Sequence, residues 1–347
     1  MKDISSIDKN LKVETEIKKE GLKFYNVLEK PFGIHGVFHD GKQFRRMPDD
    51  IAETVSPGVH YGSQYTAGGR VRFRTNSPYV AINFKGVMGR LPQMAFTGCR
   101  GFDLYNGKEY VNTFVPPLDG GTGYESIIEF GNTEEKEITI NMPLYSIVHD
   151  IYVGLDENAF VEAPKEYRVS TPVVYYGSSI TQGGCASRPG TCYQGHISRR
   201  FDCDYINLGF SGNAKGEVEM AEHIASLDMS LFVYDYDHNS PSVEHLKETH
   251  ERLFKIVREK HPELPVIIMS KPKPNYDDNG MNRLEVIRKT FENAKESGDK
   301  NVYFIDGRDL CKLCGNEGTS DNCHPTDFGF ASMAQTLGDL IEKEGLL

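Results

Sequence analysis

The pattern of apolar and polar residues changes its period near residue 170. Before that point, short segments alternate with a period of two, which is typical of strands with one face toward a core. In residues 70–75, apolar side chains alternate with three arginines, so one face of this predicted strand is expected to be wet. The other predicted strands are residues 23–28, 80–84, 102–105, 110–114, 138–142 and 147–155. Between two of them, Asn106-Gly107 predicts a hairpin with a type I′ turn.

Many short antiparallel strands predict a β-sandwich of the jelly-roll kind. We place this all-β ancillary domain at residues 21–160, after a charged lead-in at residues 1–20 and before a linker at residues 161–170. Such a domain can bind a sugar chain, shape a substrate cleft or stabilise an oligomer. The chain has no tryptophan, so a structural role is the default interpretation.

From residue 171 onward, buried strands alternate with amphipathic helices. The first predicted strand, residues 173–176, is β-branched or aromatic on both faces. The other strands are predicted at residues 205–208, 231–236, 265–270 and 302–305, and the helices at residues 193–201, 217–225, 243–257 and 281–294 and from about residue 325 onward. This order predicts an α/β domain at residues 171–347 with a parallel, flavodoxin-like sheet of five strands.

The carboxyl ends of such strands are where sites form in open parallel sheets. After the first strand, Gly177-Ser178-Ser179 turns sharply and holds a serine hydroxyl at that edge, ahead of a helical segment expected from about residue 191. The turns after the second, third and fifth strands carry residues 209–213, 237–239 and 321–325. One edge is therefore predicted to hold a nucleophile, a glycine turn, an amide and a carboxylate–imidazole pair.

These residue types suit acyl transfer. A serine hydroxyl needs a base to take its proton, and His324 is the candidate. Asp321, one turn earlier, can accept the Nδ1–H of that ring and fix its tautomer. An isolated Asp-x-x-His is more typical of a solvated turn before a helix. Catalysis is favoured here only because Ser179 and Asn239 are predicted at the same edge of the sheet.

An oxyanion needs preorganised donors, and three can be named. They are the backbone N–H groups of Ser179 and Gly212 and the side-chain amide of Asn239, while Gly209 is interpreted as a plain turn glycine.

Three further residues are candidates for the pocket wall. They are Ser178, Arg188 and His238. A loop histidine is more often simply solvated, and Arg188 lies in the loop behind the serine.

Composition excludes some functions. The net charge of −11 disfavours a nucleic-acid partner, because phosphate contacts need clustered lysine and arginine. No run approaches the ~20 apolar residues of a membrane span, and residues 1–20 lack an apolar signal region. We therefore expect a cytoplasmic protein, although an export signal outside this sequence would look the same. The oligomeric state stays open, with a homo-oligomer among the possibilities.

The seven cysteines are few and odd in number. Cys311 and Cys314 have the spacing of a metal knuckle, with Cys323 nearby, but a fourth ligand is lacking once His324 is assigned to catalysis. Reduced thiols are the preferred interpretation. We expect neither a metal nor another cofactor, and GSSITQGG lacks the Gly-Lys-Ser/Thr ending of a phosphate loop.

Four blocks in order resemble the SGNH (GDSL-type) hydrolases. They are GSSIT at 177–181, NLGFSGN at 207–213, DHN at 237–239 and DNCHP at 321–325. The resemblance covers about residues 170–347 and implies that Ser179 is the nucleophile. It also implies that Gly212 and Asn239 are oxyanion donors. Asp321 and His324 would complete the triad.

The first block, extended to GSSITQGGCASRPG, and GFDLY at 101–105 are similar to a subgroup of two-domain esterases with an N-terminal β-sandwich. Several of these are carbohydrate O-acetyl esterases, so the resemblance implies removal of a small acyl group from a sugar. Two positions depart from the family pattern: Ser178 replaces an aspartate, and Asp237 replaces a glycine. Some relatives work as dyads, but Asp321 favours a triad here.

The sequence thus predicts a serine esterase for acetyl or similar esters of an oligosaccharide or another small molecule. A lipid esterase, thioesterase or arylesterase on the same machinery stays open. So does a carbohydrate-binding protein on an inactive hydrolase scaffold.

Overall fold

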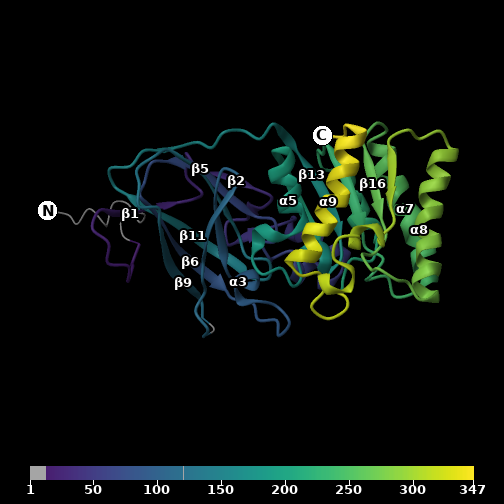
Figure 1. Cartoon of the computed structure of the whole chain (residues 1–347), viewed down its shortest axis with the longest axis horizontal. Helices are drawn as coiled ribbons and strands as arrows, with labels where there is room; N and C mark the ends of the chain where they lie inside the picture. The colour runs from purple at the N-terminus through teal and green to yellow at the C-terminus, as the bar shows by residue number, and fades with distance from the viewer. Residues whose placement is uncertain (1–12, 120) are drawn as a thin grey trace.

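The structure, a computed structural model, describes residues 13–119 and 121–347. Its two halves lie side by side along the long axis, with β1 (Leu22–Asn26) near one end and α8 (Asp278–Glu296) at the other (Figure 1). Residues 1–12 of the predicted lead-in lie outside the described residues. Within the described ranges, no helix combines the length and apolar character needed to span a membrane.

The N-terminal half is built on two antiparallel sheets that enclose a core of aliphatic and phenylalanine side chains. In sheet order, the first contains β1, β11 (Ile147–Asp156), β6 (Tyr79–Val87) and β9 (Gly123–Glu129). The second contains β12 (Val161–Glu162), β5 (Arg70–Thr75), β10 (Lys136–Asn141), β7 (Phe102–Asn106) and β8 (Glu109–Phe114), with β2 (Gly33–His35) also paired to β5. A small hairpin joins β3 (Phe38–His39) to β4 (Phe44–Arg45). Strand β12 lies in the stretch predicted as a linker.

The C-terminal half is an α/β domain with a parallel five-stranded sheet. Its strand order is β14 (Cys203–Gly209), β13 (Val169–Gly177), β15 (Leu231–Asp235), β16 (Val266–Met269) and β17 (Val302–Ile305). The chain direction across the sheet reverses at β13, so β13 and β15 flank the point where flavodoxin-like sheets bind ligands. The predicted fold class is confirmed.

Helices cover both faces of this sheet. On one face α5 (Tyr193–Phe201) and α9 (Asp327–Glu344) pack together, and on the other lie α6 (Val218–Ala225), α7 (Val243–Lys260) and α8. Shorter segments are α4 (Ser179–Gln182), α3 (Phe96–Cys99) and three 3-10 turns at Pro189–Thr191, Asp309–Cys311 and Gly315–Gly318. The five long helices begin within three residues of the positions that the apolar periodicity predicts.

None of the three helices in the described part of the N-terminal half was predicted, and besides the four-residue α3 two of them are longer. They are α1 (Asp49–Val55) and α2 (Pro57–Gly62), which interrupt the stretch interpreted as all-β. Their side chains Ala52, Val55 and Val59 join the core that covers one face of the parallel sheet. The two halves therefore share apolar core, so the N-terminal half is more than an appended module.

The prediction of a wet face on β5 is wrong. Arg70 and Arg72 are only 2% and 4% exposed. The Arg70 guanidinium forms an ion pair with Asp204 at the edge strand β14 and lies 3.8 Å from the ring centroid of Tyr205. Arg70 is covered by β14 of the α/β domain, whereas Arg72 pairs with Glu137 and lies 3.8 Å from the ring centroid of Tyr167. A period-two pattern does not reveal either contact.

The predicted hairpin between β7 and β8 is present, but its turn is not type I′. That turn needs positive φ at two central residues, and here only Gly107 has it, at +57°. A glycine at the first central position fits a type II′ turn instead.

Replacing Arg70 by alanine tests the contact between the two halves. It leaves the half-buried Asp204 with His35 as its remaining ionic partner, so we expect a loss of roughly 3 kcal/mol in the free energy of unfolding by urea. Arg74→Ala, on the same strand, is the control. Arg74 pairs with the exposed Glu135 and Glu162, so its loss should cost less than about 1 kcal/mol. Equal losses would contradict the interpretation.

Candidate active site

The serine turn follows directly from the end of β13. Ser178 is the N-cap of α4, and its hydroxyl accepts the N–H of Ile180 at 3.2 Å. Ser179 is therefore the first residue of that helix, whereas the sequence predicted the helical segment only from about residue 191. Gly177 is required, because a Cβ there would collide with the Asp235 carboxylate and the Thr181 hydroxyl.

Ser179, His324 and Asp321 form one hydrogen-bonded series. The Ser179 Oγ lies 2.9 Å from His324 Nε2, and His324 Nδ1 lies 2.7 Å from Asp321 Oδ2. Burial acts to raise the pKa of Asp321, but hydrogen bonds from the His324 backbone and ring outweigh it and hold that pKa below its usual value. The carboxylate thus stays charged and fixes the imidazole with Nε2 toward the serine.

The loop that carries His324 is shaped by the same aspartate. Its second oxygen, Oδ1, accepts the backbone N–H groups of Cys323 at 3.1 Å and His324 at 2.7 Å. Asn322, between them, has a positive φ of +62°. One carboxylate therefore holds both the backbone turn and the ring.

The predicted oxyanion donors are available. Within the described residues, no hydrogen bond is made by the backbone N–H of Ser179 or Gly212. Gly212 has a φ of +71° and space around its Cα. Asn239 accepts the Ala214 N–H through Oδ1 at 3.3 Å, which leaves its NH₂ group to donate.

Sequence reasoning missed two residues that arrange these donors. Gln182 accepts the Ser211 N–H at 2.9 Å through Oε1 and so holds the turn beside Gly212. Asn207 donates to the Thr181 carbonyl at 2.8 Å and accepts the Gly209 N–H at 2.9 Å. Both lie in quoted blocks, but their partners depend on tertiary contacts. Gly209 is more than a turn glycine, since a Cβ would strike the backbone of α4.

Two of the three predicted pocket residues are not placed as pocket wall. Ser178 is fully buried behind the serine, where it caps α4. Arg188 turns toward the β-sandwich, and its Nη1 donates to Asp103 at 2.9 Å and to the Tyr105 hydroxyl at 2.5 Å. The sequence could not show this because the partners lie more than 80 residues away.

His238 does lie near the candidate triad. Its Nδ1 is 4.0 Å from the Cys323 sulfur, next to His324 in the chain. Burial, together with the positive charge of Lys271, lowers the pKa of His238 to about 3, so the ring is neutral at pH 7. Its Nε2 is buried and has no hydrogen-bond partner among the described residues. The ring is thus half-buried beside the triad, where the sequence favoured a solvated loop histidine.

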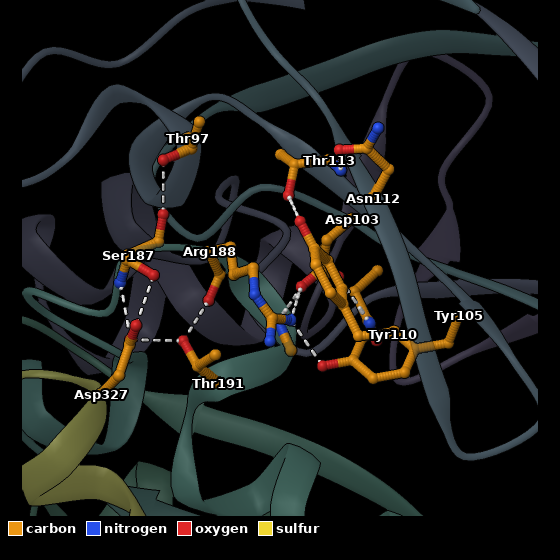
Figure 2. A network of polar contacts seen from close by, with 12 residues as sticks. Thr97, Asp103, Tyr105, Tyr110, Asn112, Thr113, Ser187, Arg188, Thr191 and Asp327 are labelled. Atoms are coloured by element: carbon orange, nitrogen blue, oxygen red, sulfur yellow. Dashed lines mark hydrogen bonds and ion pairs between the residues drawn. The ribbon is translucent and has the colours of Figure 1, made fainter. Parts of the chain in front are cut away.

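Figure 2 shows the contacts between the β-sandwich and the serine loop, defined as residues 187–191, which follows Ser179 in the chain. Asp103, which is completely buried, accepts Arg188 and the Gly190 N–H, at 2.9 and 2.8 Å. The Arg188 guanidinium also stacks 3.8 Å from the Tyr110 ring centroid. The GFDLY segment therefore acts through its aspartate and tyrosine on the loop that follows the serine.

The same loop is tied to the helix that follows His324. Asp327 accepts the backbone N–H of Ser187 at 2.9 Å, the Ser187 hydroxyl and the Thr191 hydroxyl, the last at 2.6 Å (Figure 2). On the other side, Thr97 of the N-terminal half donates to the Ser187 carbonyl at 2.5 Å. The serine loop is thus held both to the first residue of α9, which follows the His324 loop, and to the β-sandwich.

All seven cysteines are free. Cys311 and Cys314 are buried, whereas Cys323 is half-buried. Over the ranges that the structure describes, no group of three His, Cys, Asp or Glu side chains is placed to hold a metal ion.

Two carboxyl groups are buried behind the site, at the end of β15. The Asp235 carboxyl accepts the Thr181 hydroxyl at 2.5 Å, and burial raises its pKa well above the usual value. Burial also raises the pKa of Asp237 to about 6, and neither of its side-chain oxygens has a hydrogen-bond partner among the described residues. Asp237 therefore binds a proton more tightly in the folded than in the unfolded protein.

This difference predicts a pH-dependent stability. Between pH 4 and 6, roughly, the folded state holds more protons at Asp237 than the unfolded state, so this residue's contribution to stability falls as the pH rises through about 6. Asp237→Asn removes the effect. We expect the variant to gain about 2 kcal/mol relative to wild type between pH 4.5 and pH 7.5 in urea unfolding. A pH-independent difference would contradict the buried-carboxyl interpretation.

Comparisons with known proteins show the family of each half. Residues 170–342 match the family model of the GDSL-like lipase/acylhydrolase family, and residues 22–161 match that of the N-terminus of SGNH-hydrolase-type esterases. None of the curated proteins that were compared matches the chain.

Several solved structures share the fold over both halves. A Bacteroides ovatus protein assigned as a GDSL-like lipase is 29% identical, with 93% of this chain and 97% of that chain covered and a TM-score of 0.84. The salicylyl-acyltransferase SsfX3 from a tetracycline biosynthetic pathway is 20% identical, with 95% and 99% covered and a TM-score of 0.79. An acetyl xylan esterase from Butyrivibrio proteoclasticus is 12% identical, with 94% and 99% covered and a TM-score of 0.62.

The two family models together cover nearly the whole chain. The protein is a carboxylic ester hydrolase and belongs to the GDSL-like lipase/acylhydrolase family, with the N-terminal domain of SGNH-hydrolase-type esterases.

Proposed function

We propose that the protein removes a small acyl group, acetyl in the first place, from a carbohydrate through a Ser179–His324–Asp321 triad. The observation that carries this proposal is the hydrogen-bonded series from the Ser179 Oγ through both nitrogens of His324 to Asp321. It gives the serine a base, and the base a fixed tautomer.

The reaction begins when His324 Nε2 takes the Ser179 proton and Oγ attacks the ester carbonyl carbon. The resulting oxyanion accepts hydrogen bonds from the N–H groups of Ser179 and Gly212 and from the Asn239 amide. His324 then passes the proton to the leaving alcohol, and the acyl group remains on Oγ. Water, deprotonated by His324, attacks this ester and releases the acid, and the proton returns to Ser179.

The proposed substrate class comes from the architecture of the chain. The two-domain architecture is shared with an acetyl xylan esterase and with a family two carbohydrate esterase from Clostridium thermocellum in complex with cellohexaose. These neighbours are only 12% and 13% identical. They supply the hypothesis that the ester is acetyl and the alcohol a sugar, and substrate assays must test it.

The first experiment measures acetate release from p-nitrophenyl acetate and from an acetylated oligosaccharide mixture. Wild type should turn over both, and Ser179→Ala neither, because Oγ forms the acyl-enzyme. Turnover of p-nitrophenyl acetate alone would keep the machinery but favour a lipid, thioester or aryl substrate. Absence of turnover with both would favour a binding protein on an inactive scaffold.

The second experiment separates a triad from a dyad. In Asp321→Asn the amide NH₂ would face Nδ1 and favour the tautomer with the proton on Nε2, which cannot accept the serine proton. We expect kcat to fall by on the order of 10³–10⁴ while the urea midpoint changes little. Near-wild-type kcat would show that His324 works without the carboxylate.

A further inference from the structure

A series of ring contacts leads from the surface of the N-terminal half to the serine. The rings of Tyr61 and Tyr65 lie 5.4 Å apart, and those of Tyr65 and Tyr145 lie 5.7 Å apart, centroid to centroid. The Tyr145 hydroxyl donates to the backbone carbonyl of Ser179 at 3.5 Å. Tyr145 is 4% exposed and Tyr61 is 56% exposed, so the series opens to solvent at Tyr61.

Arg46 holds the helix that carries Tyr61 against β14. The buried Arg46 donates to the Gly62 carbonyl at 2.5 Å and to the Tyr65 carbonyl at 2.9 Å, at the end of α2. The same guanidinium donates to the carbonyls of Asn207 and Gly209, at 3.1 and 2.5 Å. One cation thus fixes α2 against the strand end that leads into the oxyanion turn.

The helix also packs closely on that turn. A Cβ on Gly58 would overlap the Asn213 side chain, and one on Gly62 would lie 3.2 Å from the Phe210 ring. Residues 210–213 contain Gly212, the proposed oxyanion donor. The helix that carries Tyr61 therefore packs on the turn that contains the proposed oxyanion donor.

Packing alone does not explain Tyr61. An aromatic ring left more than half exposed gives up the burial that usually stabilises it. The neighbouring His60 hydrogen-bonds to Asp49 of α1 at 2.8 Å. The contact between α1 and α2 therefore does not depend on the Tyr61 ring. An exposed tyrosine on a helix that packs on the oxyanion turn offers a ligand an apolar ring face and a polar hydroxyl.

We propose that Tyr61 and Tyr65 form an aromatic ledge, defined as these two residues, that binds the apolar C–H face of a sugar ring next to the acylated sugar. The inference rests on the proposed function and deepens it, because it assigns preference for an oligosaccharide over a single acetylated sugar. Tyrosine suits this role, since its ring covers the C–H face while its hydroxyl reaches the sugar's hydroxyl groups.

The kinetic test compares kcat/KM for an acetylated xylo-oligosaccharide with that for an acetylated methyl xyloside. Tyr61→Ala should lower the ratio of the two values about tenfold, the size expected from one lost stacking contact. Tyr61→Phe keeps the ring and should keep the ratio within about twofold. Tyr25→Ala also removes a tyrosine ring, from β1 at the far end of the β-sandwich, and should leave the ratio unchanged (Figure 1).

An unchanged ratio in Tyr61→Ala would overturn the inference. So would an equal loss for both substrates, which would indicate damage to the oxyanion turn.

A binding experiment separates this inference from the proposed reaction. Calorimetry with Ser179→Ala measures the Kd for the acetylated xylo-oligosaccharide without turnover. Adding Tyr61→Ala should weaken binding about tenfold even if the wild type proves to hydrolyse another ester. The same Kd with and without the Tyr61 ring would overturn the inference about the aromatic ledge. Absence of acetate release by the wild type, with the Kd still dependent on Tyr61, would overturn only the proposed function.

Discussion

The hydrogen bond between Ser179 and His324 joins residues 145 positions apart in the chain. Ser179 begins the four-residue helix α4 and His324 lies on a loop, and a misplacement of about 1 Å is enough to impair such a contact. Side chains from other parts of the fold hold the segments around both residues in place. Asp327 holds the serine loop to the helix that follows the histidine, and Asp103 holds the same loop to the β-sandwich.

The N-terminal half consequently belongs to the machinery even though none of its residues is in the proposed triad. Its α1 and α2 complete an apolar core of the parallel sheet, and its arginines Arg46 and Arg70 contact strand β14 and the turn after it. Most of these polar contacts end on backbone carbonyls. An arginine can satisfy several carbonyls with one rigid fork of donors, which suits a contact that must fix a turn rather than a side chain.

Much of this structure could be predicted from local pattern. The five parallel strands are continuous apolar runs because both faces are covered, and Ser179, Asp321 and His324 come together because strand ends share one edge. What escaped prediction depends on partners distant in sequence. Arg70 has the pattern of a solvated strand residue until Asp204 is placed over it, and Gln182 has no distinguishing signal until Ser211 folds back onto it.

The order of the two halves along the chain has a consequence for biosynthesis. The β-sandwich leaves the ribosome first, and the surface that it later buries carries Arg46, Arg70 and Asp103. The same surface also carries the apolar side chains Ala52, Val55 and Val59, so until the second half is made the first half exposes both charged groups and apolar surface of the kind that attracts other chains. The partners of the charged groups, the carbonyls and side chains near β14 and the serine loop, arrive only with the second half. The first half therefore waits with an incomplete core, and both its apolar and its polar contacts are completed only when the second half folds against it.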